Sequence, residues 1–66
     1  MIPTPGQNWR HSMSGETRHV VQVDTSHVQG SEPEWSVCWV RRGDSVFFWC
    51  GQHVWSAWAC DAILEQ

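Results

Sequence analysis

The chain has 66 residues, which is enough for one domain at most. A domain of this size buries only about 60% of the surface that its unfolded chain would expose, so its stability depends on large apolar side chains. Six tryptophans and two phenylalanines meet that need. Each buried aromatic side chain removes about 150–250 Å² from water. Six tryptophans are more than one small core is expected to hold, and this surplus is the main functional clue.

The charged residues argue against two classes of partner. The formal net charge is −3, lysine is absent, and the full positive charges are those of Arg10, Arg18, Arg41 and Arg42. Binding to a phosphate backbone needs a basic stripe, which four scattered arginines do not provide. The longest strongly apolar run, Val46 to Cys50, is far too short to span a membrane. We therefore expect neither a nucleic-acid partner nor a membrane anchor.

The cysteines indicate the compartment. Cys38, Cys50 and Cys60 are an odd number, whereas a disulfide framework in a small secreted domain uses an even set. Residues 1–11 contain no apolar segment of the kind found in signal peptides. These features predict a cytoplasmic protein with reduced thiols.

The first half of the chain predicts two strands. Residues 1–6, with two prolines and a glycine, are expected to form a flexible lead-in to a single β domain over residues 7–66. The segments in order are a strand over 7–11, a turn over 12–16, a valine-rich strand over 17–24 and a long loop over 25–34.

The second half predicts three more strands and a helical turn. The segments are an alternating strand over 35–41, a turn at Arg42-Gly43-Asp44, a strand over 45–50, a two-residue hairpin loop at Gly51-Gln52, a strand over 53–57 and a short helical turn over 58–65. Five short strands with tight hairpins predict a mostly β fold. The leading architecture is a small five-stranded SH3-like or Tudor-like barrel with a short C-terminal helical turn.

Two segments resemble a pattern found in short, uncharacterised phage and prophage proteins. They are the opening Trp9-Arg10-His11 with the valine strand after it, and the ending His53-Val54-Trp55-Ser56-Ala57-Trp58 followed by Asp61 and Ile63-Leu64. The tryptophan-rich middle, residues 35–50, departs from that pattern. The resemblance implies a bacterial or phage origin and a small β fold, and it implies no activity.

The predicted hairpins assign side chains to two faces, because directly paired residues share a face. With two-residue loops at Arg42-Gly43 and Gly51-Gln52, the core face collects Trp35, Val37, Trp39, Val46, Phe48, Cys50, His53, Trp55 and Ala57. The opposite face collects Ser36, Cys38, Val40, Ser45, Phe47, Trp49, Val54 and Ser56, with Trp58 beside them. A three-residue loop at 42–44 would exchange the faces of one strand.

The aromatic side chains of the second face are the candidate site. An exposed aromatic patch usually marks an interaction surface, so Phe47, Trp49, Val54 and Trp58 are the predicted partner-binding residues. The alternatives are that the loop over 25–34 or the C-terminal turn covers them, or that a homodimer buries them.

Four other functions are open alternatives. An aromatic cage for a cationic side chain would need three aromatics around one point, which the sequence does not place. A zinc site could use Cys50 and His53 with Cys38 and Cys60. A single-stranded nucleic-acid binder would use aromatic stacking. An enzyme is the fourth alternative, but the sequence contains no nucleophile elbow, phosphate loop or paired-carboxylate motif that would support it.

The sequence therefore predicts a non-enzymatic protein-interaction domain of bacterial, phage or prophage origin, with a bacterial protein as its partner. No cofactor is expected.

Overall fold

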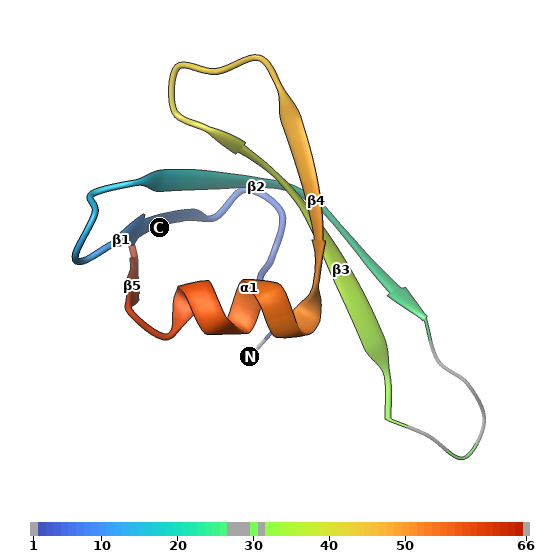
Figure 1. Ribbon diagram of the computed structural model, residues 1–66. Helices are drawn as coiled ribbons and strands as arrows, with labels where there is room; N and C mark the ends of the chain where they lie inside the picture. The colour runs from blue at the N-terminus through green and yellow to red at the C-terminus, as the bar shows by residue number, and fades with distance from the viewer. Residues whose placement is uncertain (1, 27–29, 31, 66) are drawn as a thin grey trace.

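The computed structural model describes residues 2–26, 30 and 32–65. Its elements are β1 (Asn8–His11), β2 (Thr17–Ser26), β3 (Glu34–Arg41), β4 (Phe47–Gly51), α1 (Gln52–Ala59) and β5 (Ala62–Leu64). The strands form one antiparallel sheet in the order β4-β3-β2-β1-β5 (Figure 1). The mostly β prediction is confirmed. The sheet is open, because β4 and β5 are its two edges and do not pair with each other.

The long β2–β3 hairpin extends further than predicted. Thr25, Ser26 and Glu34, which were expected in a loop, are paired strand residues. Residues 27–29 and 31 of that predicted loop, and Met1 of the predicted lead-in, lie outside the described residues.

A β-bulge in β2 places two valines on the same face. Val20 lies opposite Trp39, whereas Gln22 lies opposite Cys38, so Val21 has no partner in the ladder. A bulge of this kind adds one residue to a strand and increases its twist. As a result Val20 and Val23, three positions apart, both point to the core side of the sheet.

The β3–β4 hairpin keeps the predicted faces but not the predicted register. Trp39 lies opposite Phe48 rather than Val46, and the connection covers residues 42–46 rather than two residues. The shift is by two residues, and an even shift leaves each residue that remains in a strand on its original face. Val46, which was predicted on the core face, lies in the connection and is 57% exposed. The Trp39 and Phe48 rings stack with centroids 4.7 Å apart. The three-residue loop, which would have exchanged the faces, is excluded.

The strand predicted over residues 53–57 is wrong, because this segment is helical. Helix α1 begins directly after β4, and Gly51 is its extended N-cap residue rather than part of a hairpin turn. Trp55, Trp58 and Ala59 follow the spacing i, i+3, i+4, which puts them on one side of a helix. Gln52 ties the start of α1 to the sheet, since its Oε1 accepts a 2.8 Å hydrogen bond from the backbone N–H of Trp35.

The helical turn predicted over residues 58–65 is also wrong, because most of that segment follows the helix. Residues Ala62–Leu64 form β5, which pairs with β1 through Ile63 opposite Arg10. The backbone and hydroxyl of Ser12 both donate to the carbonyl of Asp61, at 2.8 and 2.6 Å. This anchor lets the chain turn from the helix into the strand.

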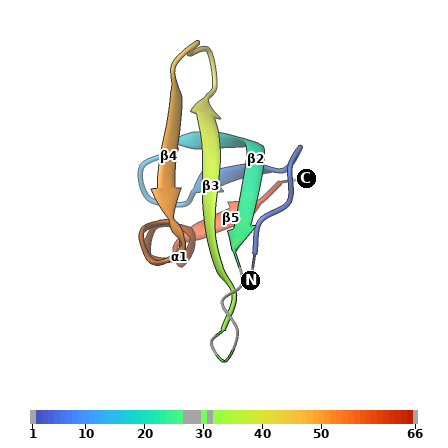
Figure 2. The ribbon, with the colours of Figure 1, turned by 90° about the vertical axis from the view of Figure 1, so that its right-hand side faces the viewer.

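Helix α1 covers one face of the curved sheet and connects its two edges. It runs from β4 to β5 beneath the sheet (Figure 1), while β4, β3 and β2 lie side by side (Figure 2). The core between helix and sheet contains the buried side chains of Val20, Val37, Trp39 and Trp55. We call this side of the sheet the inner face and the opposite side the outer face.

The residues before β1 lie along the sheet. The Gly6 N–H donates to the Val20 carbonyl at 2.9 Å, the Val20 N–H donates to the Gln7 carbonyl at 2.9 Å, and Pro3 is buried. Within the described part of the chain, no helix has the length and apolar character needed to cross a membrane.

Candidate functional site

Two large aromatic side chains lie on the outer face of the edge strand β4. Phe47 is 62% exposed and Trp49 is 51% exposed. Their strand neighbour Phe48 packs against the core, so the two aromatics that flank it point away from α1. We call Phe47 and Trp49 the β4 patch. The sequence predicted that these two side chains share a face, and the hairpin register places them on one.

The middle of the sheet continues the β4 patch. Val40 lies opposite Phe47, and Cys38 lies opposite Trp49. Cys38 is only 5% exposed although it is on the outer face. Burial raises the pKa of the Cys38 thiol, and the negative charge of Asp24 raises it further. The thiol is therefore a neutral, apolar neighbour of the patch rather than a reactive group.

The other two predicted site residues are not on this strand face. Val54 is 63% exposed, but it belongs to α1 rather than to the sheet. Trp58 packs against the core cluster, and its ring lies 5.3 Å from that of Trp55. The structure thus brings together two of the four predicted residues, with Val54 exposed elsewhere and Trp58 half-buried under the sheet.

The tryptophans are divided unequally between the core and the surface. Five of the six belong to the core cluster or pack against it, namely Trp9, Trp35, Trp39, Trp55 and Trp58. Trp49 is the one left outside. The core holds more tryptophan side chains than the sequence suggested, and Trp49 on β4 is the single tryptophan left for the surface.

An arginine lies between two of the core tryptophans. The guanidinium carbon of Arg18 is 3.8 Å from the Trp39 ring centroid and 4.0 Å from that of Trp58, with Trp55 at 5.7 Å. A guanidinium stacked on aromatic faces is attracted by their negative electrostatic potential. Three aromatic rings therefore surround one cation, which the sequence alone did not place.

One carboxylate joins this arginine to a second one. Oε2 of Glu16 lies 2.8 Å from Nε of Arg18 and 3.3 Å from Nε of Arg41. Burial acts to raise the pKa of the Glu16 carboxyl, but the hydrogen bonds and positive charges of Arg18 and Arg41 outweigh it and hold the pKa below its ordinary value. Arg41 also lies over the Phe48 ring, 5.0 Å from its centroid.

This arginine cluster is a part of the fold rather than a binding site. The Arg18 side chain is only 11% exposed, so the protein's own guanidinium fills the space that a cationic ligand would need. Sequence reasoning missed the cluster, although one signal was present. Arg18 is two residues before Val20, which places both side chains on the inner face of β2.

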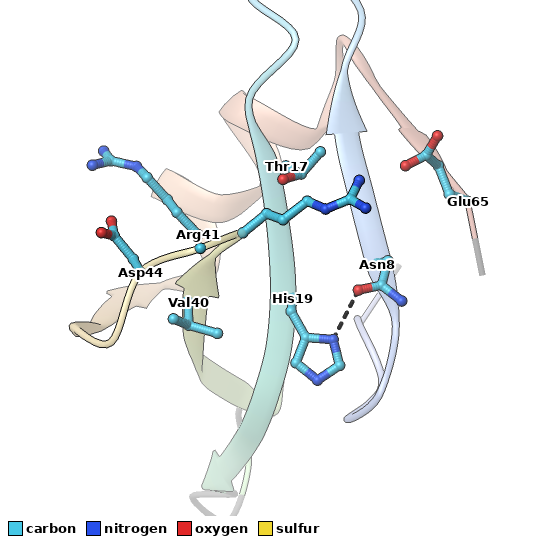
Figure 3. A pocket seen from close by; sticks show the side chains of 9 residues that line it. Asn8, Thr17, His19, Val40, Arg41, Asp44 and Glu65 are labelled. Carbon is cyan, nitrogen blue, oxygen red and sulfur yellow. Dashed lines mark hydrogen bonds between the residues drawn. The ribbon is translucent and has the colours of Figure 1, made fainter.

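A pocket of about 500 Å³ lies beside the ends of β1, β2 and β3 (Figure 3). Its lining comprises Asn8, Thr17, His19, Val40, Arg41, Arg42, Gly43, Asp44 and Glu65. Nδ1 of His19 lies 2.8 Å from the amide oxygen of Asn8. Glu65 is bound to Arg10 at 3.0 Å and Arg41 to Glu16, so these charges are already paired. The other charged residues of the lining, Arg42 and Asp44, are opposite in sign, so the pocket carries no excess of one charge.

The three cysteines do not converge on one point. Cys38 lies on the outer face, Cys50 is opposite Val37 on the inner face, and Cys60 is exposed after α1. Among the described residues, no group of three or more His, Cys, Asp or Glu side chains is arranged to hold a metal ion. The geometry gives the zinc alternative no support.

Comparison with protein-family models, with curated proteins and with solved structures found no match to this chain. The assignment of a function therefore rests on the geometry of the chain itself.

Proposed function

We propose that this chain is a non-enzymatic protein-interaction domain that binds a polypeptide partner through the β4 patch. The observation that carries the proposal is the position of Trp49, half-exposed on an edge strand while the other five tryptophans pack in or against the core. Tryptophan is enriched among the residues that dominate interface energies, because it buries a large area at a small cost in conformational entropy.

The edge position of β4 suggests how a partner would dock. An extended peptide can add a strand to an exposed sheet edge, with backbone hydrogen bonds giving affinity and side chains giving specificity. A strand added beside β4 would place its own outward side chains next to Phe47 and Trp49. The β4 patch would then select partners with apolar side chains at alternate positions.

Two further features support an SH3-like architecture as part of the proposal. Strands β1 to β4 form an antiparallel meander, β5 pairs with β1 at the edge opposite β4, and α1 connects the two edge strands. We infer a small, incompletely closed barrel of that kind. The resemblance of both ends of the chain to phage and prophage proteins makes a bacterial protein the first partner to seek, and the free thiols fit the cytoplasm.

Single-stranded nucleic acid is a weaker candidate for the same surface. Trp49 offers a ring on which a base could stack. Three of the four arginines, however, are engaged in ion pairs with Glu16 or Glu65. The β4 patch therefore lacks the positive groove that would follow a phosphate backbone.

Capture of partners from bacterial lysate tests the proposal. The baits are the wild-type chain, Trp49→Ser and Ile63→Ser, each shown to be folded by near-UV circular dichroism. Ile63 is a matched control because it is 50% exposed on the other edge strand. Removing an interface anchor costs about 2 kcal/mol or more, which is about a 30-fold loss of affinity.

We expect one partner to be retained by the wild type and by Ile63→Ser and lost by Trp49→Ser. Equal recovery by all three baits would show that the β4 patch does not bind it.

A further inference from the structure

Strand β4 has an unprotected edge. In the described part of the chain it pairs with β3 alone, so the backbone groups along its other side have no strand beside them. Natural proteins protect such an edge with charged residues, proline or a bulge, because it is a template for pairing with another chain. Residues 47–51 read Phe-Phe-Trp-Cys-Gly, and their pairing with β3 has no register shift. None of the three protections is present.

The other edge strand is protected. β5 has only three residues, Ala62–Leu64, and the acidic residues Asp61 and Glu65 flank it. A very short strand with charges at both ends pairs poorly with another chain. The contrast marks β4 as the edge that is open to association.

The charge around β4 indicates which chain fits there. No Asp, Glu, Lys or Arg occurs between Ser45 and Cys60, so β4 and α1 carry none of the net charge of −3. An uncharged strip gives a charged partner no attraction and an identical strip no repulsion. Two copies, which repel each other elsewhere, can therefore approach along this edge.

We propose that β4 pairs with β4 of a second copy in a two-fold symmetric dimer. This dimer rests on the proposed function, because it uses the same β4 patch. It names a second copy of the chain as the molecule that binds there. A two-fold axis perpendicular to the sheet makes the two β4 strands antiparallel and the interface self-complementary. With each Phe48 opposite its own copy, each Phe47 stands opposite a Trp49 on the outer face, and cross-strand aromatic pairs stabilise a sheet.

The size of this interface predicts a weak dimer. A stable dimer buries about 800 Å² of each partner, whereas the whole chain exposes 4597 Å² and β4 has only five residues. We therefore expect dissociation in the micromolar range or above, as for small transient interfaces. A partner that binds more tightly would displace the second copy, so self-pairing covers the β4 patch until that partner arrives.

Sedimentation equilibrium tests the dimer directly. The wild type, Trp49→Glu and Ile63→Glu are compared from about 10 µM to about 1 mM. Trp49 and Ile63 are matched, at 51% and 50% exposure. We expect the mass of the wild type and of Ile63→Glu to rise from 7.6 kDa toward twice that value. Trp49→Glu places two like charges at the proposed β4–β4 interface, and we expect the dimer to associate at least tenfold more weakly.

Amide hydrogen exchange in the wild type provides a test that needs no variant. Exchange of the β4 amides should slow as concentration rises, while exchange in β5 stays constant. A wild-type chain that remains monomeric, with β4 amide exchange independent of concentration, would overturn the proposed dimer. The proposed function would still stand if Trp49→Ser loses the partner that the wild type captures from lysate. Association that survives Trp49→Glu and fails in Ile63→Glu would place the contact at β5 and also overturn the proposal.

Discussion

Replacing Trp55 by alanine is expected to unfold most of the protein. Trp55 is 1% exposed and is the largest fully buried side chain among the described residues. Its ring meets that of Trp9 edge-on at 6.2 Å and lies 5.3 Å from Trp58. Truncation of a buried tryptophan lowers the free energy of unfolding by about 3–5 kcal/mol, which is comparable to the whole stability expected of so short a domain.

Urea unfolding followed by near-UV circular dichroism measures this loss, and Trp49→Ala is the matched control. Trp49 is half-exposed, so the same change there should lower the free energy of unfolding by about 1 kcal/mol or less. Similar losses in the two variants would show that α1 does not place Trp55 in the core.

Replacing Arg18 by alanine is expected to have the second largest effect on stability. The change removes a guanidinium that stacks on Trp39 and Trp58 and is bound to Glu16. A desolvated cation–π contact contributes about 2 kcal/mol, and a hydrogen bond to a charged group about 1.5–3 kcal/mol. Because these terms are not additive, we expect the free energy of unfolding to fall by about 3 kcal/mol.

Two substitutions separate stacking from charge in the same urea experiment. Arg18→Lys keeps the charge but lacks the planar group that lies between the rings, so it should recover only part of the loss. Arg42→Ala removes an exposed arginine of the β3–β4 loop and should leave stability nearly unchanged. If Arg18→Ala and Arg42→Ala unfold at the same urea concentration, the stacking of Arg18 between Trp39 and Trp58, the Arg18 sandwich, contributes nothing to stability.

The faces of the sheet were predictable because alternation is a local property. Trp35, Val37 and Trp39 alternate with smaller residues, and the structure places Val37 and Trp39 in the core. The hairpin register was not predictable, since the connection over residues 42–46 is longer than the two-residue turn that Gly43 suggests. The faces survived only because the error in register was an even number of residues.

The helix was missed because its sequence fits two periods. Val54, Trp55, Ser56 and Ala57 alternate well enough for a strand, while Trp55, Trp58 and Ala59 match one helix face. Gly51 favours a hairpin turn and also serves as a helix N-cap, so it does not decide between the two. The packing of Trp55 in the core stabilises the helix over the strand. The local sequence does not indicate this tertiary packing.

The candidate site was partly predictable for the same reason. Phe47 and Trp49 are two apart on one strand, so their shared face follows from the sequence. The place of Trp58 depends on α1, and the Arg18 sandwich joins β2, β3 and the helix. Contacts between elements distant in the chain have no signature in a single sequence, which is why the sandwich was not found.

The proposed binding site depends on the exposure of Trp49, and fluorine NMR of the chain labelled with 5-fluorotryptophan tests this exposure most directly. The six labelled tryptophans give six resonances, and Trp49→Phe identifies the one from β4. We predict that the Trp49 resonance shows the largest solvent isotope shift between H₂O and D₂O and the largest change as protein concentration rises. A Trp49 resonance that is insensitive to solvent, while that of Trp55 responds to both, would contradict the division into core tryptophans and one displayed for binding.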